Sequence, residues 1–368
     1  MQFFKKICFI FIPVLMVLQI VPVTAFAEND IFSYTLKPDG TAEISCHDTS
    51  VETAEIPSEI DGHAITSLGE NCFADCVSLK SVTIPDSITE IGAYAFYGCS
   101  ALEEIEISEF VTTIGEFAFD ATEAVTAFAV SEKNPAYQSP DGVLYNKAGN
   151  TLIKYPESKP DNTYAVLDSC QEIADWAFIG AQNLQQIDLK HVKIIGADAF
   201  CWCVSLKEVT IPEGVVELDG SAFGYCRDLE RVALPSTVTA IGDRCFYSCT
   251  NLKQLILPEG LKKIGEYAIC HCTSLTELLV PKSLETVNID CMGYAYNEEK
   301  NEYYVQENMT LHVYRNSTAW RYATTNHIHY EYVQTNTIYY ILIAVFVVII
   351  IILSIAIVKL LKNRRESA

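Results

Sequence analysis

A motif of 23 residues that recurs along most of the chain constrains the fold more than any other feature of the sequence. One unit runs from Ile84 to Glu106, and the next starts at Ile107 with the same apolar pattern. An earlier, longer unit runs from Ile56 to Thr83. The later units begin at Val166, Leu189, Ile211, Leu234, Leu257 and, as a closing fragment, Val280. Repeats of this length predict a solenoid, in which similar units stack and share one core.

Within each unit, the apolar spacing predicts one coil of that solenoid. Apolar and polar residues alternate at the end of the segment from Leu79 to Ile84, which is typical of a short strand with one face toward the core. A proline follows this strand in most units and ends its hydrogen bonding. Ala95, Phe96 and Cys99 then predict one inward-facing helical turn. Neither half of a coil can bury its apolar side alone, so the coils are expected to stack about 4.7 to 4.9 Å apart.

The full pattern Ile-Pro-x-x-Ile-x-x-Ile-Gly-x-x-Ala-Phe-x-x-Cys-x-x-Leu-x-x-Val resembles the leucine-rich repeat of the BspA-like surface proteins. The resemblance covers Ile56 to Val287. It implies a repeat solenoid of stacked parallel β-strands and short helical turns, in a cell-surface binding protein without catalytic activity.

The segments outside the repeat are expected to form caps and an insertion. Two alternating segments around a Pro-Asp-Gly turn predict a capping hairpin from Tyr34 to Cys46. Leu311 to Ala323 resembles the strand and helix that close such arrays. Turn sequences on both sides of an apolar stretch predict that residues 131–165 form a hairpin projecting from one side. The expected regions are a capping segment (28–55), a solenoid (56–291) containing this insertion, and a C-terminal cap with a juxtamembrane segment (292–337).

Both ends of the chain have features of an exported, membrane-anchored protein. Two lysines precede an apolar run that ends in Ala25-Phe26-Ala27, so residues 1–27 are predicted to be a cleaved signal peptide. Residues 338–358 carry no charge and are long enough for one transmembrane helix. The basic residues of the tail, 359–368, favour a cytoplasmic C-terminus and an extracellular solenoid.

Charge excludes some classes of partner. The predicted extracellular part, residues 28–337, has 19 basic and 46 acidic residues and therefore a net charge of −27. A surface with this charge repels polyanions, so the sequence argues against a nucleic-acid partner. A protein or glycan ligand and the membrane anchor remain as the expected partners.

Six of the chain's 14 cysteines occupy one column of the repeat. A column residue faces inward, and free cysteine is among the most buried residue types, which favours buried thiols. Disulfides, common in exported proteins, and a zinc site are the alternatives. The column consists of Cys76, Cys99, Cys203, Cys226, Cys249 and Cys272.

No catalytic motif is found in the sequence. The seven histidines are scattered, and nucleophile-elbow, metalloprotease and phosphate-loop patterns are missing. We therefore expect no enzyme activity, no cofactor and no metal.

An apolar strip on the strand face is the candidate binding site. In the strand pattern, the third and fifth positions face outward, and the fifth column becomes apolar toward its end. An exposed apolar strip with a polar rim is typical of an interaction surface. Alternatively, the segment after Met292 folds over the strip as part of the cap. The predicted site consists of Arg231, Ala233, Gln254, Ile256, Glu277 and Leu279.

Two functions are compatible with these features. The first is a non-catalytic surface protein whose solenoid binds a protein or glycan, as in adhesion. The second is an envelope-structural or receptor-like protein that uses the solenoid as a scaffold.

Overall fold

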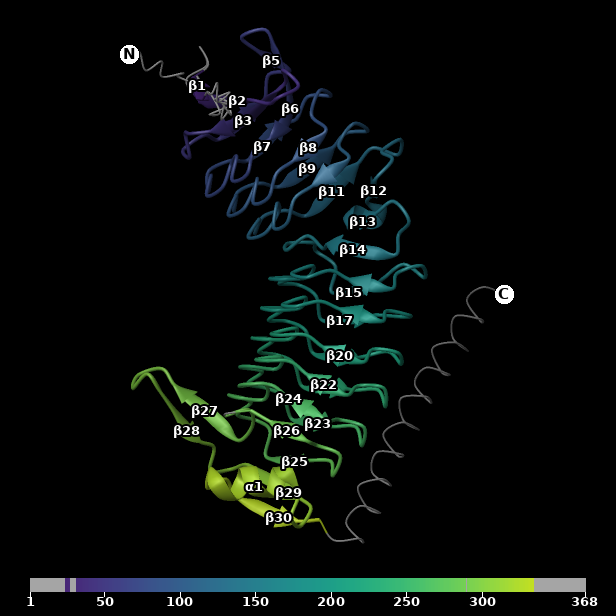
Figure 1. Ribbon diagram of the computed structural model, residues 1–368, viewed down its shortest axis with the longest axis vertical. Helices are drawn as coiled ribbons and strands as arrows, with labels where there is room; N and C mark the ends of the chain where they lie inside the picture. Colours follow the sequence, from purple (N-terminus) through teal and green to yellow (C-terminus); the bar gives the residue numbers. More distant parts are fainter. Residues whose placement is uncertain (1–23, 27–30, 289, 334–368) are drawn as a thin grey trace, which may run out of the picture.

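The computed structural model describes residues 24–26, 31–288 and 290–333 (Figure 1). The predicted signal peptide lies outside these residues except for strand β1 (Thr24–Phe26), which pairs with β2. The predicted transmembrane segment 338–358 and the tail 359–368 also lie outside them. Within the described residues, no helix is long and apolar enough to cross a membrane.

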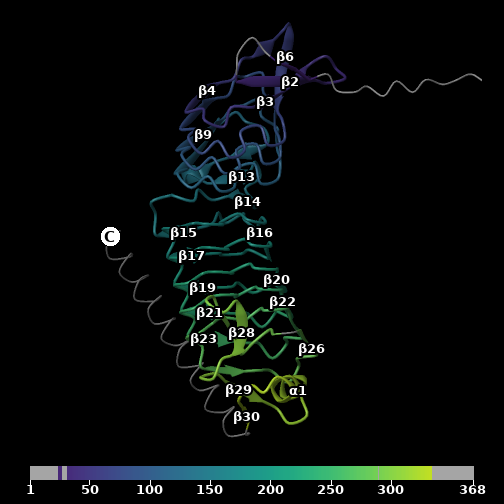
Figure 2. The ribbon, with the colours of Figure 1, turned by 90° about the vertical axis from the view of Figure 1, so that its left-hand side faces the viewer.

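The described chain forms a stack of coils, and each typical coil contributes one short strand to each of two parallel columns (Figure 2). The first column consists of β4 (Thr53–Glu55), β7 (Ser81–Thr83), β9 (Glu104–Ile107), β11 (Ala127–Val130), β15 (Thr163–Ala165), β17 (Gln186–Asp188), β19 (Glu208–Thr210), β21 (Arg231–Ala233), β23 (Gln254–Ile256) and β25 (Glu277–Leu279). The second column consists of β6 (His63–Leu68), β8 (Glu90–Ile91), β10 (Thr113–Ile114), β14 (Thr151–Lys154), β16 (Glu172–Ile173), β18 (Ile194–Ile195), β20 (Glu217–Leu218), β22 (Ala240–Ile241), β24 (Lys263–Ile264) and β26 (Thr286–Val287).

Stacked phenylalanine rings fill the centre of the solenoid. Phe200 lies 4.7 Å from Phe178 and 5.1 Å from Phe223, and Phe223 lies 5.7 Å from Phe246, between ring centroids. All four side chains are fully buried. These four successive coils therefore each supply one ring to an aromatic column, so the predicted inward position of this residue is confirmed.

The segment predicted as a helical turn is instead a pair of tight turns. The N–H groups of Ala95 and Cys99 bond within their own coil, whereas those of Tyr94 and Phe96 donate to Glu116 and Ala118 of the next coil. Tyr94 has a φ of 55°, in the left-handed region, which a helix interior does not tolerate. The prediction of helical turns is therefore wrong, because half of the N–H groups leave the coil.

A glycine column lets the backbones of neighbouring coils approach at these turns. A Cβ atom on Gly115 would lie 2.3 Å from the backbone nitrogen of Ala93, and one on Gly92 would lie 2.7 Å from the carbonyl carbon of Gly69. Neither distance is sterically possible, so the column requires glycine at these two positions.

The column cysteines are buried free thiols, as favoured by the sequence. The thiol of Cys226 donates to the carbonyl of Phe200, 3.1 Å away, and the thiol of Cys249 donates to that of Phe223 at 3.2 Å. Each of these contacts crosses to the preceding coil. The thiols therefore supply weak polar links between coils inside the core.

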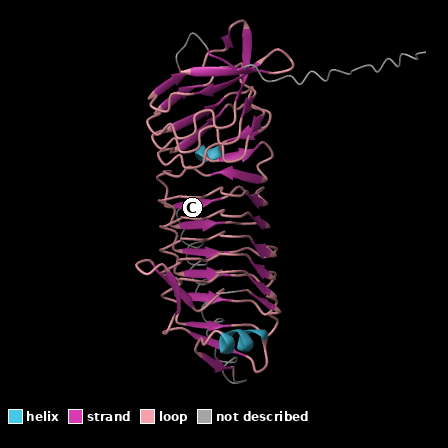
Figure 3. Ribbon diagram, turned by 60° about the vertical axis from the view of Figure 1, so that its left-hand side comes forward, coloured by secondary structure: helices cyan, strands magenta, loops and turns pink. Residues whose placement is uncertain are grey.

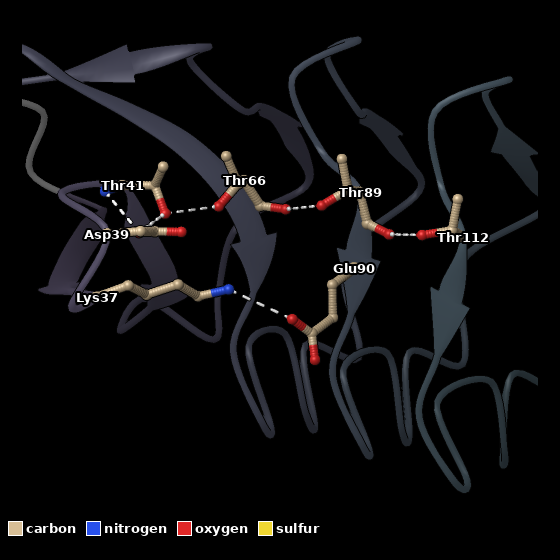
Figure 4. A network of polar contacts seen from close by, with 7 residues as sticks. All are labelled: Lys37, Asp39, Thr41, Thr66, Thr89, Glu90 and Thr112. Carbon is tan, nitrogen blue, oxygen red and sulfur yellow. Dashed lines mark hydrogen bonds and ion pairs between the residues drawn. The ribbon is translucent and has the colours of Figure 1, made fainter.

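The N-terminal cap is the predicted hairpin, in which β2 (Phe32–Leu36) and β3 (Ala42–Cys46) pair antiparallel. β3 continues into the stack through β6, and the short β5 (Glu59–Ile60) lies against β6. Figure 4 shows how polar side chains fasten this cap to the first coils. Lys37 Nζ lies 3.3 Å from Glu90 Oε2. A row of threonines, one per coil, links Thr41, Thr66, Thr89 and Thr112.

The C-terminal cap contains the predicted strand and helix, β29 (Thr310–Val313) and α1 (Thr318–Thr325), followed by β30 (Tyr330–Tyr332). Figure 3 shows α1 at the lower end of the stack. The Ser317 hydroxyl caps the helix by accepting from the Trp320 N–H. A hairpin of β27 (Tyr294–Asn297) and β28 (Glu302–Val305) lies on the turn face, where the Tyr303 ring stacks 4.8 Å from that of Tyr267.

The insertion contains the predicted hairpin, β13 (Leu144–Asn146) with β14, but this hairpin does not project. Val143, Leu144 and Tyr145 are fully buried, and β14 pairs in parallel with β16 as a second-column strand. The expected projection is therefore wrong, because the apolar side chains of the hairpin fill the stack. β12 (Tyr137–Gln138) and a 3-10 turn (Pro140–Gly142) complete the insertion.

The hydrophobic core divides at this insertion. Leu144 packs with the N-terminal coils, whereas Val143 and Tyr145 pack with the C-terminal coils. Within the described residues, no backbone hydrogen bond joins residues 116–121 to 152–158. We call this region the joint.

Replacing Phe223 with Ala should lower the free energy of unfolding by about 3 to 5 kcal/mol, because it leaves a cavity in the aromatic column. Phe110 is 44% exposed, so Phe110→Ala is the matched control and should change stability by less than about 0.5 kcal/mol. Chemical denaturation of both variants measures the difference. Equal, small losses would contradict a central role for the aromatic column.

Cys46 should react with iodoacetamide before the column cysteines at neutral pH. Its side chain is half-buried, and a hydrogen bond from the Cys76 thiol lowers the pKa of Cys46 to about 7. Burial raises the pKa of Cys99 to about 12, so Cys99 remains a thiol. Mass spectrometry after brief labelling measures which cysteine reacts first, with Cys46→Ser as the control. Labelling of Cys99 as fast as Cys46 would contradict this assignment.

Candidate functional site

The six residues predicted as a binding site lie on three successive first-column strands. Arg231 is in register with Gln254, and Ala233 with Ile256, through the parallel pairing of β21 and β23. All four side chains are exposed, as is Glu277 of β25 in the next coil, and Ile256 is 38% exposed. The residues between them are buried: Val232, Leu255 and Leu278. The predicted alternation is therefore confirmed, and the structure brings the predicted residues together on one face.

The cap extends this face rather than folding over it. β25 pairs in parallel with β29, which places Leu279 beside His312, and β30 follows with Glu331 beside His312. Leu279 is half-buried, but Ile256 stays exposed. The alternative that the closing segment buries the strip is therefore wrong for Ile256. We call Arg231, Ala233, Gln254, Ile256, Glu277 and Leu279 the strand-face strip.

Arg231, at one end of the strip, forms an exposed ion pair that a partner could replace. Arg231 Nη2 lies 2.6 Å from Glu208 Oε2, and both side chains are about half exposed. At the other end, the largely buried His312 side chain places its Nε2 atom 3.8 Å from Glu277 Oε2. An exposed ion pair such as that of Arg231 with Glu208 contributes roughly 0 to 1 kcal/mol. Arg231 can therefore exchange Glu208 for a partner carboxylate at little cost.

A second cluster, which the sequence analysis missed, lies at the joint. Lys154, Asp120 and Glu157 are almost completely buried together. Two cavities, of about 360 and 450 Å³, open on this cluster and share Asp120 in their walls. Aligning Tyr155 with the phenylalanine column of the repeat would have revealed this cluster from the sequence. That alignment places Lys154 at the position where other coils have a small residue.

In residues 24–26, 31–288 and 290–333, no three histidine, cysteine or carboxylate side chains are grouped so that they could hold a metal ion.

Comparison with known proteins identifies the class of this solenoid. Residues 43–158 and 167–298 match the family described as BspA type leucine rich repeat region, in 6 copies. The chain therefore belongs to the BspA-type leucine-rich repeat proteins. A search of curated proteins found no significant match.

Solved bacterial structures have related folds. The pneumococcal vaccine antigen PcpA aligns over 78% of this chain and 69% of its own, with 20% identity and a TM-score of 0.55. A leucine rich cell surface protein from Faecalibacterium prausnitzii has 23% identity and a TM-score of 0.41, over 63% of this chain and 93% of its own. A leucine-rich repeat protein from Bacteroides ovatus has 22% identity and a TM-score of 0.43, over 83% of this chain and 99% of its own. At such identities, the likeness to PcpA shows a common fold alone.

Proposed function

We propose that this chain is a membrane-anchored, non-catalytic cell-surface protein that binds a protein partner through the strand-face strip. The observation that carries the proposal is the strand-face strip itself, in which the exposed Ala233 and Ile256 and the half-buried Leu279 lie on successive strands. The polar side chains of Arg231, Gln254 and Glu277 lie beside them. An apolar centre with a polar rim is the usual anatomy of a protein interface. Membership of a repeat family named for surface proteins is consistent with this role.

The chemistry of the strip favours a protein over a glycan. Its centre is aliphatic, and aliphatic side chains gain free energy mainly by burial against other apolar groups. A sugar is covered with hydroxyls that need hydrogen-bond partners when they are buried. The net charge of −27 on residues 28–337 further favours a partner with a basic surface, which the protein would attract over long distances.

Replacing both Ile256 and Leu279 with Glu should abolish partner binding and leave the fold intact. The two carboxylates would have to be buried in the complex, at a cost of several kcal/mol. Binding of the purified protein to cells that carry candidate partners, together with thermal melting, measures the two effects.

The matched control is Ser81→Glu with Thr83→Glu, which adds two carboxylates at exposed outward positions of β7. This control should bind as the wild type does. Binding of the strip variant at wild-type strength, with melting unchanged, would contradict the proposed site. The assignment to a protein partner would likewise be contradicted if removing glycans from the cells abolished binding while treating the cells with protease did not.

The predicted membrane topology has its own test. Protease added to intact cells should remove an epitope in the solenoid and leave one attached to residues 359–368, because the basic tail favours the cytoplasmic side. Immunoblotting with and without permeabilisation measures both epitopes. Loss of the tail epitope from intact cells would reverse the orientation.

A further inference from the structure

Three ionisable side chains meet in the buried joint of the solenoid. Lys154 Nζ lies 2.5 Å from Asp120 Oδ1 and 3.8 Å from Glu157 Oε1. Their side chains are only 5%, 8% and 6% exposed, respectively. Among surface ion pairs of the described chain, such as Lys190 with Asp168, at least one partner is open to water. The joint cluster therefore holds the Lys154 amine in contact with the Asp120 carboxyl group, with both side chains more than nine-tenths buried.

The repeat itself explains why a lysine is buried here. The Tyr155 ring stacks 4.8 Å from Phe178, and the Tyr155 N–H donates to the Ala177 carbonyl, so Tyr155 takes the phenylalanine position of a degenerate coil. Lys154 then occupies the inward position that Ala177 holds in the next coil. Asp120, 34 residues earlier, comes from the coil on the other side of the joint.

We propose that Lys154 and Asp120 become joined by an intramolecular amide bond that forms spontaneously after folding. The geometry supplies contact between the reacting groups and burial of their side chains, which are at most 8% exposed. Intramolecular groups held in contact react as if at effective concentrations of about 10⁵ to 10⁸ M. An ammonium has no lone pair with which to attack, so the proton on Lys154 must leave its nitrogen before the two groups can condense.

Glu157 is the group that moves the protons. Its Oε1 atom is buried and has no hydrogen-bond partner within the described residues. Burial raises the pKa of Glu157, against the opposing effect of the Lys154 charge, so Glu157 holds a proton more readily than an exposed glutamate. A carboxyl group whose near oxygen lies 3.8 Å from the reacting nitrogen can both donate and accept a proton.

The reaction balances without any other reagent. A proton first passes from the Lys154 ammonium to the Asp120 carboxylate, which leaves a neutral amine and a neutral acid. The Nζ lone pair then attacks Cγ of Asp120, Glu157 donates its proton to the departing oxygen, and Glu157 recovers a proton from Nζ. The N–C bond forms, the C–O bond breaks, and one water leaves. Asp120 lines both cavities at the joint, so the water has a route out.

Peptide mapping of the purified full chain tests this proposal directly. The denatured protein is digested with trypsin, which does not cleave after a lysine whose amine is acylated. The expected result is one branched peptide containing Asp120 and Lys154, lighter than the sum of its two arms by one water. If wild-type protein instead yields cleavage at Lys154 and an unmodified Asp120 peptide, the cluster is only a buried ion pair and the proposal is overturned.

Variants assign the roles of the three residues. Lys154→Met and Asp120→Ala should each abolish the branched peptide, and Glu157→Gln should slow its formation at least about 100-fold, as for loss of a general acid and base. Lys190→Met, which removes an exposed ion pair, is the matched control and should keep the branched peptide. Branching at another site in Lys154→Met would overturn the assignment to Lys154, and rapid branching in Glu157→Gln would overturn the role of Glu157. Circular dichroism checks that each variant is folded.

Discussion

Every second backbone N–H on the turn face donates to the neighbouring coil, and the rest of the solenoid depends on this ladder. Ser221 and Phe223 donate to the next coil, at Asp243 and Cys245. Ala222 and Gly224 instead bond within their own coil. The ladder holds coils at strand spacing, which brings the phenylalanine rings into contact and places column thiols such as that of Cys226 against a carbonyl of the coil before. Because each coil bonds and packs mainly with its neighbours, stability is shared between pairs of coils.

The joint shows what happens where this ladder is interrupted. Tyr155 begins the aromatic column of the C-terminal coils by stacking on Phe178, but the small inward residue before it is replaced by Lys154, and two cavities open beside that lysine. A lysine placed inside a core needs a partner there, because an unpaired buried charge is strongly destabilising. Asp120 supplies that partner from across the joint. The interruption of the repeat and the gathering of reactive groups therefore have one structural origin.

The repeat allowed the columns to be predicted because a residue at a given position of every coil meets the same surroundings. The outward direction of Ile256 followed from strand alternation, and the cap hairpin from its turn residues. The helical turn was wrong because the spacing of Ala95, Phe96 and Cys99 suits a helix and two tight turns equally, and the sequence does not say where the N–H groups point. The cluster at Lys154 was missed because its coil has lost the motif residues except for an aromatic ring.

The strand-face strip and the joint lie at different places along the stack. The strand-face strip lies on coils of the C-terminal core, which pack directly into the C-terminal cap through β25 and β29. Its exposure therefore does not depend on the N-terminal coils, which form a separate core beyond the joint. In a structure that is stabilised between neighbours, a weak joint lets the two cores unfold separately. At the joint of the described stack, the backbone ladder of the turn face does not hold the two cores together. A bond between Asp120 and Lys154 would link the cores at this place.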